Sequence, residues 1–515
     1  MDSMLCDELV QEIFRKLPSK PSSSLSVCLV SKRWLNLYRV SKASLSLRFL
    51  PHNSTLVSLS SLLSQYPSLS FVSLVLSDAT SSINNSTDTA FSDHLLSIVS
   101  SSCSNLRHLR FLAGPVSGLP FLSLSTSCSK LTSITVSLSR PLFLNWVVSF
   151  SCLKELFLYV CSTAGGVDDE DKRFEPISNE ELDVKFGLET LCLSGIRAAD
   201  KGVSWLWRNC KRLNKLQLKS CESVGDGESF SSFICCVEGL QEVELRKCRS
   251  IIDRVLLRLA ENCASLNSLL IHDGCSRQVL LEFITTCRRN LQKLDLRLPL
   301  DLDNDHLLAI AMNTRSLSTL RLQSCCLVTG EGLQLLGTAL NPTLEQLALI
   351  NCDVVDRELG LLATMGQNLK MLRKLDLSYN EMLVDKELVS MLVSCNNLAE
   401  LRLRGCRKLT SITMVSISKT CKSLQSVDIM NCHGIETQDV EFFVLNCPLL
   451  RQIQVEDSKV SDIARTRACH KFIEVSRSTE RPMEHLATYG AATAREERRV
   501  ATTEEVLSQG ALGDQ

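Results

Sequence analysis

The sequence predicts an α/β solenoid, an extended array in which short parallel strands alternate with helices. Three observations predict it: a repeat of 25 to 28 residues, a chain too long for one ordinary core, and cysteines that follow the repeat. The chain has 515 residues, of which 44% are hydrophobic, whereas a single core stops growing at roughly 250 to 300 residues. The length therefore requires several domains or an array, and the repeat favours the array.

The repeat is clearest from Leu398 to Cys406, where the first, fourth and sixth residues are Leu and the ninth is Cys. Further copies begin at Leu213, Leu240, Leu317, Leu344, Leu372 and Leu424, and incomplete copies begin at Leu188, Leu266, Leu291 and Leu450. Such a period is the signature of leucine-rich repeats, in which a strand and a returning helix bury their apolar faces only against neighbouring units. We expect the ninth side chain, Cys or Asn, to turn inward and hydrogen-bond the backbone where the chain leaves the strand.

Less regular copies precede these, with apolar cores at 69–74, 106–111, 131–136 and 153–158. The polar interval 77–88 and the charged interval 168–173 interrupt them, and both are predicted to be loops. The second interval is either a solvated loop or a docking segment for a partner. Helices are predicted at 252–263, 331–340, 386–395 and 438–446, with Asp253, Thr329, Asp385 and Thr437 near their starts as cap residues.

The 24 cysteines follow the repeat rather than the spacing of a metal site. One set holds the ninth position: Cys161, Cys221, Cys248, Cys325, Cys352, Cys406 and Cys432. A second set stands three residues before a strand's first apolar residue, where a helix ends: Cys103, Cys128, Cys210, Cys263, Cys395, Cys421 and Cys447. Cysteine there acts as a small hydrophobic residue, and without a C-x-x-C pair we predict no metal site. Many reduced thiols favour the nucleus or the cytoplasm.

The remaining composition excludes several functions. The formal net charge of -1 gives no reason to expect nucleic acid or an anionic membrane as a partner. No apolar run approaches the roughly 20 residues of a membrane-spanning helix. The sequence contains no G-x-S-x-G, G-x-x-x-x-G-K-[ST] or H-E-x-x-H motif, and its eight histidines are scattered. We therefore predict no catalytic residue and no cofactor.

The first 45 residues have a different rhythm. Leu5, Leu9, Ile13 and Leu17 recur at four-residue spacing, which predicts an amphipathic helix. Prolines at 18 and 21 end it, and a second helix is predicted to carry Leu25, Cys28, Leu29, Val30 and Trp34. A module this small barely supports a core of its own, so we expect it to bury apolar surface against a partner.

Residues 5–17 (LCDELVQEIFRKL) and 29–34 (LVSKRW) resemble an F-box, whose pattern is a Leu-Pro-x-Glu-Leu opening, an Ile-Phe-x-x-Leu helix and a Val-Cys-Lys-x-Trp close. Cys6 stands where the family has proline, and Ser31 stands where it has cysteine. An F-box followed by leucine-rich repeats is similar to the substrate receptors of SCF-type cullin RING ubiquitin ligases. The serine-rich module followed at once by repeats looks most like the plant members of this family.

The resemblance implies a chain that does no chemistry itself and binds a protein substrate for ubiquitination and degradation. It implies contacts with the SCF adaptor protein, and through it a cullin, by Leu5, Leu9, Ile13, Phe14, Leu17, Val30 and Trp34. It also implies an α/β fold with a short all-helical F-box ahead of a curved horseshoe like that of ribonuclease inhibitor. We expect the F-box at 1–45, degenerate repeats with loop insertions at 46–187, regular repeats at 188–474 and a disordered tail at 475–515.

Alternate strand residues face opposite ways, so the third, fifth and seventh positions should line the concave surface. The best candidates for substrate binding there are two exposed aromatic residues and three arginines whose forked donors suit carboxylate or phosphate: Phe157, Tyr159, Arg321, Arg402 and Arg404. Two alternatives stay open. The chain could be an interaction scaffold outside any ligase, or a receptor whose substrate pocket is completed by a small molecule.

Overall fold

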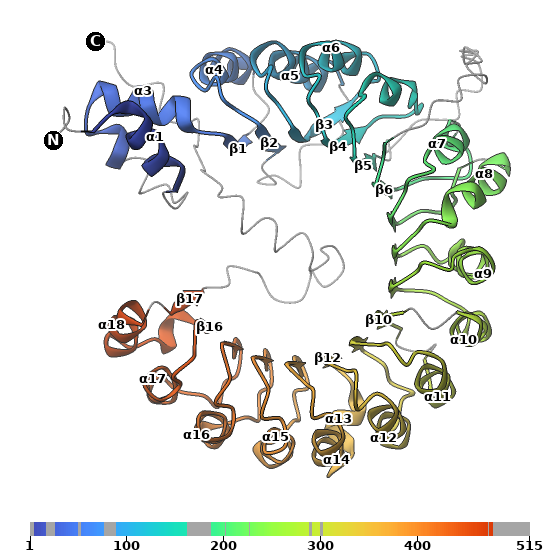
Figure 1. Cartoon of the computed structure of the whole chain (residues 1–515), viewed down its shortest axis with the longest axis vertical. Helices are drawn as coiled ribbons and strands as arrows, with labels where there is room; N and C mark the ends of the chain where they lie inside the picture. The colour runs from blue at the N-terminus through green and yellow to red at the C-terminus, as the bar shows by residue number, and fades with distance from the viewer. Residues whose placement is uncertain are drawn as a thin grey trace. The chain divides into compact units, whose positions relative to one another are not determined.

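The computed structural model describes residues 5–16, 26–49, 53–76, 89–161, 187–200, 202–225, 227–287, 291–298, 302–471 and 473–476. It confirms the predicted α/β leucine-rich-repeat solenoid, because short strands paired in parallel alternate with helices (Figure 1). The chain divides into two compact units between Cys236 and Val237. The predicted loops at 77–88 and 168–173 and nearly all of the predicted tail lie outside the described residues.

In the described residues the first unit opens with α1 (Asp7–Lys16), a short helical stretch at 26–28 and α3 (Lys32–Ser41). Its strands are β1 (Ser44–Phe49), β2 (Phe71–Leu76), β3 (His108–Val116), β4 (Ser133–Leu138), β5 (Glu155–Val160), β6 (Thr190–Ser194) and β7 (Lys215–Lys219). The helices between and after them are α4 (Asn53–Ser64), α5 (Thr89–Ser102), α6 (Pro120–Ser127), η1 (Asn145–Ser149), α7 (Val203–Asn209) and α8 (Gly227–Val237). The four degenerate copies therefore form strands of the solenoid, and β1 adds one that no leucine pattern predicted.

The second unit continues the same alternation. Its strands are β8 (Glu242–Arg246), β9 (Ser268–His272), β10 (Lys293–Arg297), β11 (Thr319–Gln323), β12 (Gln346–Ile350), β13 (Lys374–Asp376), β14 (Glu400–Arg402), β15 (Ser426–Asp428), β16 (Gln452–Gln454) and β17 (Glu474–Ser476). Its helices are α9 (Ile252–Asn262), α10 (Arg277–Thr286), α11 (Asn304–Asn313), α12 (Gly330–Ala339), α13 (Asp353–Arg357), α14 (Leu361–Asn368), α15 (Asp385–Leu392), α16 (Ser411–Thr420), α17 (Thr437–Asn446), η2 (Asp457–Lys459) and α18 (Asp462–His470). β17 pairs with β16, so the array continues one unit beyond the last leucine copy.

The core lies between the strands and the helices. The first, fourth and sixth repeat residues fill it, and Leu398, Leu401 and Leu403 are fully buried. Burial of each such side chain stabilises the fold by about 1.5 to 3 kcal/mol. Side chains at the third, fifth and seventh positions lie on the other face of the strands, which turns away from the helices (Figure 1) and is called the open face below.

The ninth side chain hydrogen-bonds the backbone as predicted. The Sγ of Cys406 donates to the carbonyl of Leu377 at 3.2 Å, one repeat earlier. Asn380 uses both ends of its amide: Nδ2 donates to the carbonyls of Leu349 and Leu377, both at 2.8 Å, and Oδ1 accepts from the amide of Cys352 at 2.9 Å. These contacts join successive repeats through otherwise unpaired buried backbone groups.

The eighth residue of the repeat adopts the left-handed backbone conformation, with φ between 48° and 80° in nine repeats. These residues are Gly195, Ser220, Lys247, Asp273, Ser324, Asn351, Tyr379, Gly405 and Asn431. Only Gly adopts this conformation without steric cost, although Asn and Asp tolerate it. The chain reverses here from strand to helix, and the ninth side chain is turned inward.

The cysteines that end helices are buried or half-buried, as predicted. Cys128, Cys210, Cys263, Cys421 and Cys447 are the C-cap residues of α6, α7, α9, α16 and α17. Burial raises the pKa of the Cys210 and Cys447 thiols to about 12. They therefore stay protonated at neutral pH and pack as small hydrophobic groups.

Of the four predicted cap residues, Thr329 stands at the N-cap position, whereas Asp253, Asp385 and Thr437 lie just inside their helices. The N-cap residues of α9, α15 and α17 are Ile251, Val384 and Glu436, and Thr329 stands at the N-cap of α12 without a side-chain hydrogen bond to that helix. The acidic side chains serve the next repeat instead. Asp253 accepts from the amide of Ser276, the N-cap residue of α10, at 2.9 Å. Asp385 accepts from the amide and hydroxyl of Thr410, the N-cap residue of α16, at 2.9 and 2.8 Å.

Candidate functional site

Helix α1 carries apolar side chains on two faces. Val10 and Phe14 are buried. Leu5, Leu9 and Ile13 are exposed by 39%, 54% and 48%, and their four-residue spacing places them on one side of the helix, with Leu5 just before its start. These three residues are called the α1 stripe below. A single exposed leucine needs no explanation, but three in register on one small helix form a surface suited to a partner.

Aromatic packing holds α1 against α3. The Phe14 ring meets Trp34 edge to face at a centroid distance of 5.5 Å and meets Tyr38 at 6.0 Å. Val10, Val27 and Leu37 complete this small core, with Trp34 and Tyr38 partly buried against it. The first helices therefore have a core of their own, and the α1 stripe is not needed to form it.

An arginine also ties the start of α1 to α3. The Nη2 of Arg33 lies 2.6 Å from Oδ1 of Asp7 and donates to the carbonyl of Leu5 at 2.8 Å. Both side chains are substantially exposed, so the pair itself contributes little free energy. Its effect is to fix the backbone at Leu5, where the α1 stripe begins.

The predicted second helix was wrong: it is broken at a turn. Leu29 and Val30 lie in that turn, and α3 begins after Ser31, whose side chain accepts from the amide of Trp34 at 3.2 Å. Leu29 and Val30 are exposed by 84% and 57%. Leu29 is thus a candidate docking residue that the sequence reading missed, although Ser31 as an N-cap residue was a signal for the break.

The structure separates the predicted adaptor-binding residues into three groups. Leu5, Leu9, Ile13 and Val30 are exposed. Phe14 is buried in the module's own core and Trp34 packs against that core, so these two are placed to hold the helices together. Leu17 lies outside the described residues.

Of the predicted substrate-binding residues, Phe157 and Tyr159 belong to the first unit. Both are half-buried at the third and fifth residues of β5. In register beside Phe157 stand Thr135 of β4 and Cys192 of β6. Small neighbours leave the aromatic ring as the largest side chain at this level of the open face, which is consistent with an anchoring role.

The three predicted arginines belong to the second unit. Strand register places Arg321 and Arg402 in one row across the open face. Successive strands contribute to this row Glu244, Leu270, Asp295, Arg321, Ala348, Asp376, Arg402, Asp428 and Gln454. Arg404 lies two residues after Arg402, in the neighbouring row. From Asp295 to Asp428 the charges in this row alternate in sign.

Arg404 is neutralised within the protein. Its Nε donates to Oδ2 of Asp428 at 3.2 Å, and its Nη2 donates to the side-chain oxygen of Gln454 at 3.3 Å. Burial raises the pKa of the Asp428 carboxyl, an effect that the Arg404 charge opposes. The guanidinium donors of Arg404 therefore point toward β15 and β16, where Asp428 and Gln454 already occupy them.

Arg321 and Arg402 are held less tightly. Both approach Oδ2 of Asp376, at 3.8 Å from Nη1 of Arg321 and 4.0 Å from Nη1 of Arg402. Arg321 also lies 3.8 Å from Asp295. These distances exceed those of direct hydrogen bonds. Burial, together with the charges of Arg297 and Arg402, lowers the pKa of Arg321 despite the two carboxylates.

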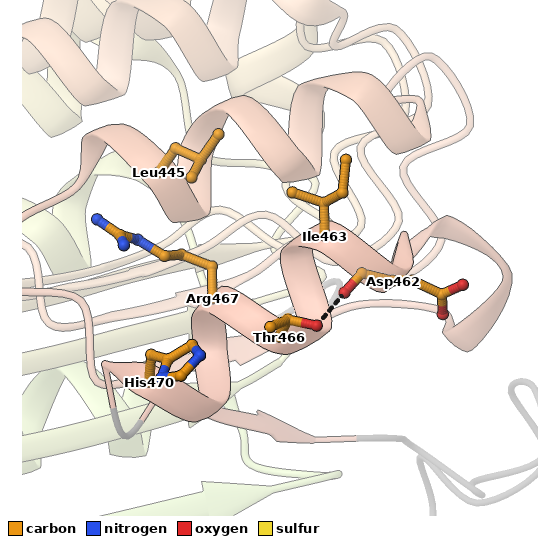
Figure 2. Close-up of a pocket in the computed structure, with 6 residues that line it drawn as sticks. All are labelled: Leu445, Asp462, Ile463, Thr466, Arg467 and His470. Atoms are coloured by element: carbon orange, nitrogen blue, oxygen red, sulfur yellow. Dashed lines mark hydrogen bonds between the residues drawn. The ribbon is translucent and has the colours of Figure 1, made fainter.

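A shallow apolar groove lies on the helical side, between α17 and α18. Leu445 comes from α17, and the α18 side chains facing it are Asp462, Ile463, Thr466, Arg467 and His470 (Figure 2). The Thr466 hydroxyl is already used, since it donates to the carbonyl of Asp462 at 2.8 Å. The groove offers apolar contact rather than a set of reacting groups.

Two further observations concern the part of the chain that the structure describes. Its His, Cys, Asp and Glu side chains form no group of three that could hold a metal ion. None of its helices has the length and apolar character needed to cross a bilayer.

The fold and these surfaces define a leucine-rich-repeat protein with an N-terminal helical module. No family model matches the sequence. The chain is similar to a chain in the crystal structure of a Rad7 and Elc1 complex in yeast, at 15% identity and a TM-score of 0.43, covering 91% of this chain and 92% of that one. It is also similar to the leucine-rich repeat-containing protein LegL7 from Legionella pneumophila, at 14% identity and a TM-score of 0.38, covering 54% and 97%. These likenesses are too weak to carry function, and the fold assignment rests on the chain's own strands and helices.

Proposed function

We propose that this chain is a non-catalytic substrate receptor of an SCF-type ubiquitin ligase. In this proposal the N-terminal module docks the SCF adaptor protein, and the open face of the repeats holds a protein substrate. The observation that carries the proposal is the α1 stripe, which stays exposed although the module has its own core. Together with the F-box-like sequence of residues 5–17 and 29–34, it supports docking of a partner rather than capping of the solenoid.

The energetics of the α1 stripe fit this role. Full burial of one Leu or Ile side chain contributes about 1.5 to 3 kcal/mol, and about half of each side chain in the stripe remains to be buried. Three such side chains in the centre of an interface make a substantial share of a stable complex. Val30 and Leu29 offer further apolar area in the same module.

The two departures from the F-box pattern keep the local structure. Ser31 caps α3 through its side chain. The carbonyl of Cys6 accepts the amide of Val10 at 3.2 Å, so α1 begins at this position without proline. Proline there would restrict the unfolded chain rather than add a contact. The departures therefore leave the exposed stripe in place.

The proposed activity is scaffolding. A receptor that holds a substrate and an adaptor on one chain raises the effective concentration of substrate lysines near the ubiquitin-conjugating enzyme. No reacting group is needed on the receptor itself. No observation on the described residues specifically favours the alternative of a small-molecule-dependent pocket.

Co-purification with the SCF adaptor protein tests the proposal. The unaltered chain should retain the adaptor, and the double variant Leu9→Asp/Ile13→Asp should lose it, because charges would be buried at the interface. Leu122 and Ile412 are equally exposed residues on the repeat helices α6 and α16, so Leu122→Asp and Ile412→Asp serve as matched controls that keep binding. Failure of the unaltered chain to bind the adaptor would contradict the proposal and favour an interaction scaffold outside any ligase.

A further inference from the structure

The open face of β10 to β15 carries one more positive than negative side chain in its fifth and seventh repeat positions. The cations are Arg297, Arg321, Arg402 and Arg404, and the anions are Asp295, Asp376 and Asp428. All seven lie within the second unit. These side chains are close enough to one another that each carboxylate can be assigned to the arginines nearest to it.

Two of the carboxylates accept direct hydrogen bonds from a guanidinium, and one of these, Asp295, is also approached by Arg321 at 3.8 Å. Arg297 binds Asp295 through two hydrogen bonds, at 3.0 and 2.9 Å. Arg404 binds Asp428 at 3.2 Å. Each pair is neutral overall, and charge-assisted hydrogen bonds of this kind are stronger than hydrogen bonds between neutral groups.

The third carboxylate is shared. Asp376 is approached by both Arg321 and Arg402, at 3.8 and 4.0 Å. Its other oxygen accepts from the amide and hydroxyl of Ser378, at 3.1 and 2.6 Å. One carboxylate therefore faces two guanidiniums across gaps too long for direct hydrogen bonds, and one positive charge in this group stays uncompensated.

Unsatisfied polar atoms lie at the same place. Within the described part of the chain, the buried Nε of Arg321 and the buried side-chain oxygen of Gln323 have no hydrogen-bond partner. Gln323 is two residues beyond Arg321 on the same face of β11 and is only 9% exposed. A buried polar atom without a partner costs about 1 to 3 kcal/mol, so an acceptor group that reached the Nε of Arg321 would be bound favourably.

A small residue opens the space between the charges. Ala348 of β12 stands in register between Arg321 and Asp376, and Arg321 reaches across it toward Asp376. A larger side chain at position 348 would occupy the space between Arg321 and Asp376. Arg402, whose side chain is 50% exposed, is accessible from solvent at the far end.

We propose that Arg321 and Arg402, with Asp376 between them, form an anchoring subsite for one carboxylate of an acidic protein segment. A single carboxylate supplies the one missing negative charge and accepts from forked guanidinium donors. A phosphate group carries nearly twice that charge, which exceeds the single positive charge left uncompensated here. The substrate class is therefore a polypeptide with an exposed Asp or Glu, an assignment that rests on the proposed function of the open face.

The test uses the full chain and a synthetic bead-bound library of 12-residue peptides that includes Asp, Glu, Gln and phosphoserine at the randomised positions. Peptides selected by the unaltered chain should be enriched in Asp or Glu at one position. Arg402→Gln should weaken binding of the selected peptides about tenfold or more, which is the scale of one charge-assisted hydrogen bond. Arg407→Gln is the matched control, because Arg407 is an exposed arginine of the same unit paired with Glu381 at 3.2 Å. It should bind as the unaltered chain does.

Several results would overturn the subsite: no peptide selected, no acidic enrichment, enrichment of phosphoserine alone, or acidic enrichment that survives Arg402→Gln. Arg321→Gln, checked for folding by circular dichroism, gives a second reading of the same subsite and should also lose the enrichment. Adaptor binding is measured on the same preparations. Leu9→Asp/Ile13→Asp should leave peptide selection unchanged, so failure of the subsite and failure of adaptor docking are separately visible.

Discussion

A buried ion pair joins the segments after β4 and β6 in the first unit. The guanidinium of Arg140 binds the Asp200 carboxylate through Nε at 2.8 Å and Nη2 at 3.0 Å. The same guanidinium donates to the carbonyls of Cys161 and Gly195 at 3.0 and 2.7 Å. Asp200 also accepts the amide of Arg197 at 2.8 Å, and its side chain is 5% exposed. The pair thus connects the two sides of the interval that holds the charged residues 168–173.

Replacing Arg140 by Met removes the partner of a buried carboxylate and leaves two carbonyls without their donor. Removal of one partner of a buried pair costs about 3 to 5 kcal/mol. The double variant Arg140→Met/Asp200→Leu should recover part of this loss, because no unpaired charge then remains.

Tryptophan fluorescence during urea unfolding is the assay. All four tryptophans, at 34, 146, 205 and 207, belong to the first unit, so their signal reports on the unit that contains the pair. Lys154→Met is a control, since Lys154 belongs to the same unit and its ion pair with Glu189 is exposed and contributes little. A loss below about 1 kcal/mol for Arg140→Met, or a double variant no more stable than the single one, would refute the reasoning.

The leucine pattern predicted the fold because each apolar position is decided within one repeat. The copy from Leu398 to Cys406 specifies its own strand, core residues and inward thiol. The unit containing β1 was missed, since Ser44–Phe49 alternates serine with leucine and lacks the ninth-position residue. Asp385 was assigned to its own helix, whereas its carboxylate serves Thr410 in the next repeat. Spacing along the chain predicts where a side chain stands within its repeat, but not whether it hydrogen-bonds its own repeat or the next one.

For the candidate sites too, the sequence predicted where the residues stand in the repeat or helix but not which side chains are exposed or paired. The four-residue spacing of Leu5, Leu9 and Ile13 was visible in the sequence, but their exposure depends on how Phe14 packs against α3. The arginines look alike in the sequence. Arg404 differs from Arg402 only because Asp428, 24 residues away, turns toward it.

Three further predictions concern stability. Lys247→Gly should stabilise the second unit by about 0.5 to 1 kcal/mol in urea unfolding followed by circular dichroism, because Lys247 is exposed at a φ of 53°; a destabilised variant would contradict this. Leu403→Asp should abolish cooperative unfolding and protease resistance of the second unit, whereas Ile412→Asp on the exposed side should not. Burial and the charges of Arg297 and Arg246 lower the pKa of His272 below its ordinary 6.5. The unfolded chain therefore takes up a proton that the folded chain does not, and stability falls as pH drops through about 6.5. His272→Gln should reduce that fall, and an unchanged pH profile of the urea midpoint would contradict it.

The most direct measurement is a calorimetric titration of the purified SCF adaptor protein into the full chain and into Leu9→Ala. The account predicts binding to the unaltered chain and a loss of about tenfold or more in affinity for Leu9→Ala, the range of an interface hot spot. Urea unfolding of Leu9→Ala should match the unaltered chain, since the Leu9 side chain lies outside the module's core. Equal affinity for both chains, or no binding to either, would contradict the claim that the α1 stripe docks the adaptor.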